Sequence, residues 1–268
     1  MIQWVSMTEP ATLSWYSRYQ WSLIVVGAWI VATLWMSVWQ LFSLHWPVSV
    51  TMMFGSFVAG ATSEGGGAIA FPVFTKLLHI APATARDFAL AIQSIGMTCG
   101  SLLIIRSGYS FFPDLVSRVV FGAAVGVCAG LTWLVPFVPP PYPKILFTLF
   151  TVCFGVFLAW ENFAECRPRD EEAHVHVELG WGACLVIGLL GGLISSVVGS
   201  GADVILFVVL CRRFSCHEKT ATRTTIPIMA LTSQIGFLFQ MTTGKLAPGV
   251  LEMRSEERRV GKECEDLC

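Results

Sequence analysis

Residues 179–202 read LGWGACLVIGLLGGLISSVVGSGA, a run of 24 residues without Asp, Glu, Lys or Arg. About 20 apolar residues are enough to cross a bilayer as an α-helix. Similar charge-free runs cover residues 21–44, 46–63, 88–105, 119–143 and 224–244. Backbone amides in lipid must be paired within the segment, and the runs lack the alternating polarity of a membrane barrel. The sequence therefore predicts an all-α, polytopic helical membrane protein.

The composition agrees with this fold class. Of the 268 residues, 54% are hydrophobic and 13% are charged, whereas about 25% are charged in an ordinary soluble domain. The formal net charge of −1 gives no reason to expect a nucleic acid partner. The nine cysteines form no CxxC pair, so we expect small apolar residues within helices, with no metal site, cofactor or disulfide framework.

We expect about seven membrane segments after a polar N-terminal segment, residues 1–19. They lie at about 20–44, 46–78, 84–106, 117–138, 142–160, 179–212 and 221–243, within a membrane domain of residues 20–253. The second and sixth are longer than one crossing requires. Each contains a glycine cluster, Glu64-Gly-Gly-Gly-Ala68 or Gly199-Ser-Gly-Ala-Asp203. Because glycine breaks helices, each segment is predicted to be two half-helices around an unwound stretch, or a helix followed by a re-entrant piece.

The C-terminal segment from Arg254 to Cys268, RSEERRVGKECEDLC, differs from the rest of the chain. It carries four basic and five acidic residues and resembles the conceptual translation of a common sequencing-adapter DNA. We expect that residues 254–268 are not native and that further helices of the protein are missing. A short charged cytoplasmic tail is the alternative.

The two glycine-broken segments resemble each other. Gly65-Gly-Gly-Ala68 matches Gly199-Ser-Gly-Ala202, and Thr84-Ala-Arg86 matches Ala221-Thr-Arg223 at nearly the same offset. We therefore expect an internal duplication with halves at about residues 46–106 and 179–243. If every segment crosses once, the two halves have parallel orientation; if the broken segments are re-entrant hairpins, that conclusion does not hold.

Lys and Arg are distributed unevenly between the two expected sides. With one crossing per segment, eight lie on the N-terminal side and five on the other; the five are Arg106, Arg118, Arg167, Arg169 and Lys245. The positive-inside rule then predicts a cytoplasmic N-terminus.

The two glycine clusters are the first candidates for a substrate site. Paired, glycine-interrupted membrane segments are typical of transporter binding sites, and a helix that begins inside the membrane points free backbone N–H groups at an anion. The alternative is that these glycines only allow close helix packing. The expected substrate contacts are Gly65, Gly66, Gly67, Gly199, Ser200 and Gly201.

Ionisable and polar residues near the clusters extend this site. Glu64 and Asp203 are candidates for proton coupling, because burial raises the pKa of a carboxyl group; pairing with a neighbouring Arg or capping of a half-helix is equally compatible. Arg86 and Arg223 open matching helices, and a guanidinium suits an oxyanion, although Arg at a helix end is also an ordinary topology signal. Thr224 and Gln93 lie close to them in sequence.

At these motifs the chain resembles the TauE/SafE family, the sulfite-exporter-like permeases of the bacterial inner membrane. The resemblance rests on residues 60–72 with Ala85-Arg86-Asp87, and on residues 191–203 with Glu218-Lys-Thr-Ala-Thr222. It implies transport of small sulfur-containing anions, such as sulfite or organosulfonates, and about eight membrane helices in two halves.

The sequence thus favours a secondary transporter of small anions, with proton coupling as a hypothesis, and not an enzyme. A passive anion channel and a non-transporting membrane sensor or scaffold are the alternatives. The expected partners are the anionic substrate and the lipid bilayer, with a homo-oligomer left open. The expected location is the bacterial inner membrane.

Overall fold

The computed structural model describes residues 46–61, 67–139, 141–164 and 179–244, together with positions 24, 27, 31 and 177. The first predicted segment, residues 20–44, lies outside the described residues except for three helical positions. The tail from Arg254 onward also lies outside them. The described residues form helices and no strand, which confirms the all-α prediction.

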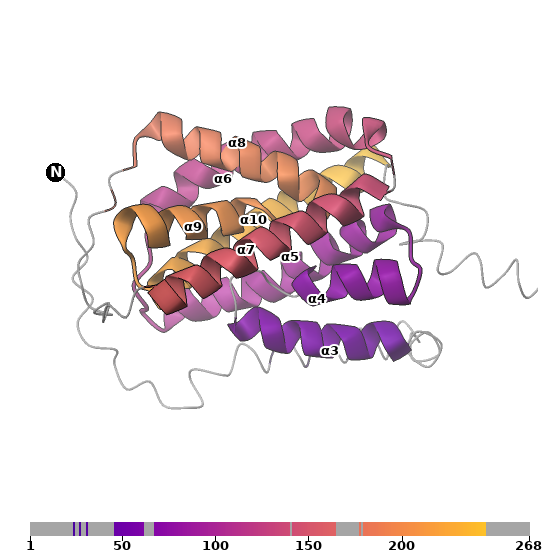
Figure 1. Cartoon of the computed structure of the whole chain (residues 1–268), viewed down its shortest axis with the longest axis horizontal. Helices are drawn as coiled ribbons and strands as arrows, with labels where there is room; N and C mark the ends of the chain where they lie inside the picture. The colour runs from indigo at the N-terminus through magenta and orange to yellow at the C-terminus, as the bar shows by residue number, and fades with distance from the viewer. Residues whose placement is uncertain are drawn as a thin grey trace, which may run out of the picture.

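The described helices pack side by side, as Figure 1 shows. The elements are α3 (Trp46–Ala61), α4 (Gly67–Pro72), the π-helical turn η1 (Val73–Leu77), α5 (Pro82–Arg106), α6 (Pro113–Ala129), η2 (Gly130–Leu134), η3 (Val135–Phe137), α7 (Pro141–Ala164), α8 (Trp181–Val198), α9 (Ala202–Phe214) and α10 (Glu218–Thr243).

Local sequence explains several helix ends. Proline stands in the first turn of α5 and α6, where the missing N–H has no intrahelical partner in any case. Gly199, Ser215 and Gly244 end α8, α9 and α10 in the left-handed conformation, which turns the chain away from the helix axis.

Four continuous stretches of the described chain are long and apolar enough to cross a membrane: Pro82–Arg106, Pro113–Phe137, Pro141–Trp160 and Trp181–Val198. The helix α10 is 26 residues long and is not among them; polar residues, including Thr232, Ser233 and Gln240, lie buried along it. On α7 a row of large apolar side chains is exposed instead, as suits a surface in contact with lipid; the row consists of Ile145, Leu149, Val152, Val156 and Trp160.

The predicted break in the sixth segment is present, and the chain reverses there. A Cβ at Gly191 of α8 would lie 2.3 Å from Cα of Ala202, the first residue of α9. In a straight helix these residues would be about 16 Å apart. The helices α8 and α9 therefore form a hairpin. The first broken segment folds back similarly, because Val48 and Met52 of α3 pack on the cluster that contains Phe71 and Phe74.

The matched helices α5 and α10 lie side by side and antiparallel. Asp87 bonds to Gln240 and Gln93 to Ser233, and Gly100 lies against Ile226. Partner numbers thus fall along α10 as they rise along α5. Arg86 and Arg223 begin the parts of these helices that match in sequence, so the matched parts run in opposite directions. Of the two alternatives that the sequence left open, parallel halves are wrong.

The count of Lys and Arg on each side of the membrane assumed that every segment crosses once. The reversal at the break changes which of these residues share a side. The end of α9 and the start of α10 lie at the same end of the bundle as the connection from α5 to α6, because Arg223 stacks on Tyr109 and Phe112 donates its N–H to Thr224. Six described basic residues lie at this end: Arg106, Arg118, Arg212, Arg213, Lys219 and Arg223. Three lie at the other: Lys76, Arg86 and Lys144.

Helices α6 and α8 pack closely and in parallel through glycines. Gly122, Gly126 and Gly130 recur every four residues on α6 and η2, so they share one face. A Cβ at Gly126 would lie 2.4 Å from the carbonyl oxygen of Leu189, and one at Gly188 would lie 2.2 Å from that of Val119. These glycines allow the two helices to pack closely.

Candidate functional site

The break between α8 and α9 consists of the three residues that the sequence singled out. Gly199 closes α8 with φ 99° and donates its N–H to the carbonyl of Ser195 at 2.8 Å. Ser200 is buried, and Gly201 precedes the first turn of α9. By helix length, α8 extends about 27 Å from Trp181. The break therefore lies toward the far end of the bundle and not at its centre.

Backbone geometry explains the glycines of this break. The positive φ of Gly199 is a conformation that L side chains rarely adopt. A Cβ at Gly201 would lie 2.8 Å from the carbonyl oxygen of Gly191. Both residues are thus needed for the hairpin itself, and Ser200 supplies the only side chain with a polar group among the three.

The first break cannot be compared with the second atom by atom. Glu64, Gly65 and Gly66 lie outside the described residues. Gly67 is the first residue of α4. The predicted substrate contacts at Gly65, Gly66 and Gly67, and the predicted proton coupling through Glu64, therefore stay predictions.

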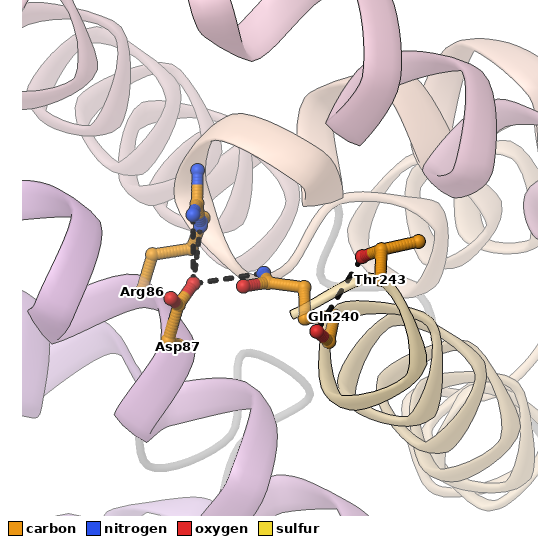
Figure 2. Close-up of polar contacts among 4 residues, drawn as sticks. All are labelled: Arg86, Asp87, Gln240 and Thr243. Atoms are coloured by element: carbon orange, nitrogen blue, oxygen red, sulfur yellow. Dashed lines mark hydrogen bonds and ion pairs between the residues drawn. The ribbon is translucent and has the colours of Figure 1, made fainter. Parts of the chain in front are cut away.

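A buried charged cluster joins the start of α5 to the end of α10 (Figure 2). Arg86 bonds to Oδ1 of Asp87 through Nε at 2.8 Å and through Nη2 at 2.7 Å. Gln240 donates from Nε2 to the same oxygen at 2.8 Å. All three residues are buried. Figure 2 shows the Asp87 carboxylate between the guanidinium and the amide, so it holds both in place.

Arg86 also lies against the break. A Cβ at Gly199 would be 4.0 Å from Cγ of Arg86 and 3.5 Å from Cβ of Ala89. The structure thus brings together Arg86 and the Gly199–Gly201 turn, which are separated by more than 100 residues in the sequence. This is the part of the predicted site that comes together.

Gln93 extends the polar surface toward the middle of the bundle. Ser233 of α10 donates to its Oε1 at 3.3 Å, while Nε2 of Gln93 is buried without a hydrogen-bond partner. Gln240 similarly leaves its Oε1 buried and unpartnered. Gln93 lies seven residues after Arg86, about 10 Å along α5. Polar side chains therefore line the contact between α5 and α10 from Arg86 inward.

Arg223 and Thr224 lie elsewhere. Arg223 places its guanidinium 4.2 Å from the ring centroid of Tyr109, and Thr224 donates to the carbonyl of Thr220 at 2.8 Å. Because α5 and α10 are antiparallel, the start of α10 faces the end of α5, about 25 Å from Arg86. The structure therefore does not bring Arg223 and Thr224 together with Arg86 and the second break, and substrate contact through them stays a prediction. Inversion of the halves separates them.

Asp203 is an isolated buried carboxylate at the start of α9. Its Oδ1 accepts the N–H of Gly201 at 2.9 Å, and its Oδ2 is buried without a partner. The residue is 2% exposed, and within the described part of the chain no cation pairs with it. This contact favours a local role at the start of α9 over pairing with an Arg, and proton coupling through Asp203 stays a prediction.

Sequence reasoning assigned no role to Asp87, Ser233 or Gln240. One signal was available, since Ser233 and Gln240 are seven residues apart and so share one helix face. Asp87 directly follows Arg86, which makes it a natural counter-ion. These residues are brought to one polar contact only by the antiparallel packing of α10 against α5.

Long apolar helices packed around a buried charged cluster define a multi-pass α-helical membrane protein. A model of the family described as "Sulfite exporter TauE/SafE" matches residues 48–253, well over half of the chain. The protein belongs to the TauE/SafE family of membrane transporters, which confirms the resemblance seen in its glycine motifs. Comparison with curated proteins gave no match, nor did comparison with solved structures.

Proposed function

We propose that this transporter moves small sulfur-containing oxyanions, such as sulfite or organosulfonates, as a secondary transporter coupled to protons. The observation that carries the proposal is the buried Arg86, held by Asp87 and Gln240 beside the break between α8 and α9. A buried, ionised side chain in a membrane protein is costly and is usually kept for function. The name of the family supports the choice of sulfur oxyanions.

The chemistry of the cluster suits an oxyanion. Asp87 engages Nε and Nη2 of Arg86, which leaves the donors of Nη1 for a substrate oxygen. A guanidinium binds planar or tetrahedral oxyanions through parallel N–H groups. The unpartnered Nε2 of Gln93 offers a further donor deeper in the bundle. We assign substrate contact to Arg86 and Gln93.

Inverted halves also support a carrier mechanism. In such folds the same site opens alternately to either side as one half moves against the other. The contact between α5 and α10, where the polar side chains lie, is the contact between the two halves. For orientation, we propose that the end with six described basic residues faces the cytoplasm of a bacterial inner membrane. A cytoplasmic N-terminus remains part of the proposal.

The test is uptake of radiolabelled sulfite, or of a small organosulfonate, into liposomes that contain the purified full chain. Arg86→Gln is expected to remove flux, because it removes the guanidinium donors that would bind the anion's oxygens. Arg86→Lys should retain the charge but lose most of the affinity, since an ammonium lacks the planar fork. Arg212→Gln, on an exposed residue of α9, is the matched control and should transport normally.

An imposed pH gradient separates the carrier from its alternatives. Proton coupling predicts that the gradient drives accumulation above equilibrium. Flux that only follows the anion's own gradient would indicate a passive channel or uniporter. Absence of flux for every sulfur oxyanion would overturn the substrate class and favour a sensor or scaffold.

A further inference from the structure

Arg86 and Asp203 lie on two different helices next to the break, and their side chains favour ions of opposite sign. On the α5 side, Arg86 carries a cationic guanidinium, and its Cγ lies beside the turn at Gly199. On the α9 side, the carboxyl group of Asp203 accepts the N–H of Gly201, one of the backbone donors that an anion would need. The carboxylate thus occupies the N-terminus of α9 and neutralises its positive end. An anion at that terminus would meet a buried negative charge.

The other groups at the turn also favour a cation. The last carbonyls of α8 have no partners within that helix and carry the negative end of its dipole. Oδ2 of Asp203 is buried without a partner, which is expensive for a carboxylate in a low-dielectric environment. In transporters with broken helices, unwound carbonyls and half-helix C-termini are suited to Na⁺ or H⁺.

We propose that the turn between α8 and α9 binds the coupling cation, H⁺ or Na⁺, with Asp203 as its charged ligand, while the substrate anion binds separately at Arg86. The role of the cation in transport rests on the proposed anion-carrier function; its binding does not. This division reassigns Gly199, Ser200 and Gly201 from the anion to the cation.

Charge balance explains why both ions would be needed together. Arg86 and Asp87 neutralise each other, so an anion bound there leaves one uncompensated negative charge, in addition to that of Asp203. A cation on Asp203 removes the second charge. The anion and the cation therefore stabilise each other's binding in the same buried region, because the effective dielectric constant there is low.

Most other charged groups of the described helices lie far along the bundle from the break. Helix α8 contains no Asp, Glu, Lys, Arg or His, and its Cys184 lies near its opposite end. Lys144 of α7 donates to the carbonyl of Thr75. The remaining charged side chains on the described helices around α9 sit at the end of the bundle far from the break: Arg106, Asp114, Arg118, Arg212, Arg213, Glu218, Lys219 and Arg223.

Cation binding is measured on the detergent-purified full chain without any anionic substrate, by thermal unfolding in Na⁺ or choline at constant ionic strength between pH 5 and pH 8. We expect Na⁺ or low pH to raise the Tm of the wild type by a few degrees, as for any ligand of the folded state. A rise with Na⁺ identifies Na⁺, and a rise with acidity alone identifies H⁺.

Asp203→Asn keeps an oxygen for the N–H of Gly201 but removes the charge, so its Tm should no longer respond. Asp114→Asn, on an exposed acid of α6, should respond as the wild type does. Asp203→Glu keeps the carboxylate but moves it outward by one methylene group, so the variant should bind the cation several-fold more weakly. If Asp203→Asn does not fold, Asp203→Glu provides the test. Equal responses in the wild type and both Asp203 variants would overturn the proposal.

In liposomes, Asp203→Asn should make anion flux insensitive to the cation gradient, whereas Asp114→Asn should keep the gradient dependence of the wild type. A cation-dependent Tm without flux of any sulfur oxyanion would sink the proposed substrate and leave the cation site standing. Gradient-driven flux that survives in Asp203→Asn would sink the cation site alone.

Discussion

Gly191 and Ala202 lie backbone against backbone, with 2.3 Å between an ideal Cβ on the glycine and Cα of Ala202. This contact closes the hairpin of α8 and α9. Since the opposing atom is backbone, it cannot rotate away from an added methyl group.

Gly191→Ala is therefore expected to destabilise the protein, by about 1–3 kcal/mol if the hairpin opens slightly. Gly182→Ala, in the same helix with no atom within 4 Å of its ideal Cβ, is the control; it should be neutral or stabilising because alanine favours helix. Thermal unfolding of both variants in detergent measures the difference. Equal Tm values would mean that the hairpin is looser than described.

The stability cost of a substitution at Gly199 should depend on how well the new residue adopts a positive φ, and not on the volume of its side chain. Its φ is 99°, yet the nearest atom to an ideal Cβ is 3.5 Å away. Gly199→Ala should cost about 1–2 kcal/mol through left-handed strain. Gly199→Asn, which is larger but more tolerant of that region, should cost less. If alanine proved the milder substitution, steric volume and not φ would control this position.

Gln240→Leu should weaken anion binding through Arg86. Leucine removes the 2.8 Å hydrogen bond to Asp87, and a bond to a charged partner contributes about 1.5–3 kcal/mol. We expect the KM for the anion to rise about tenfold or more, with maximal flux less affected. Thr242→Val, on an exposed residue whose hydroxyl bonds only within α10, is the control. A lower Tm with an unchanged KM would make Gln240 purely structural.

Single cysteines should be labelled from opposite sides of the membrane at Lys76 and Arg212. Both side chains are exposed, and they lie at opposite ends of the bundle. With native cysteines replaced, a membrane-impermeant maleimide added to intact cells should label Lys76→Cys, while Arg212→Cys should require permeabilisation. The reversed pattern would put the more basic end outside and contradict the proposed orientation.

Run length and glycine placement were enough to predict the membrane helices and the second break. Both signals are local: a helix must be long and apolar to cross lipid, and glycines permit an unwound turn. The sequence left the reversal at that break as one of two alternatives, because the choice depends on contact between Gly191 and Ala202, which a straight helix would keep apart. Whether a glycine turn bends or reverses is decided by such packing.

Only part of the candidate site was predicted, because the rest depends on how the helices pack. Arg86, Ser200 and Asp203 follow from the motif, and the structure places all three at or near the break. Arg223 was added by equivalence between the halves, and inversion carries equivalent residues to opposite ends of the bundle. Gln240 lies outside the repeated motif, so only the antiparallel pairing of α5 with α10 connects it to Asp87.

The turn at Gly199 has a consequence for how the chain is inserted during synthesis. Because α8 and α9 reverse there, α10 enters the membrane in the direction opposite to α5. A chain in which α8 and α9 formed one straight helix would emerge with α10 turned over, and Arg223 would be delivered to the other compartment. The backbone conformation at residue 199 thus decides which of two membrane topologies α10 adopts. Substitutions that let α8 and α9 form one straight helix are expected to yield a mixture of both topologies, and degradation by membrane quality control.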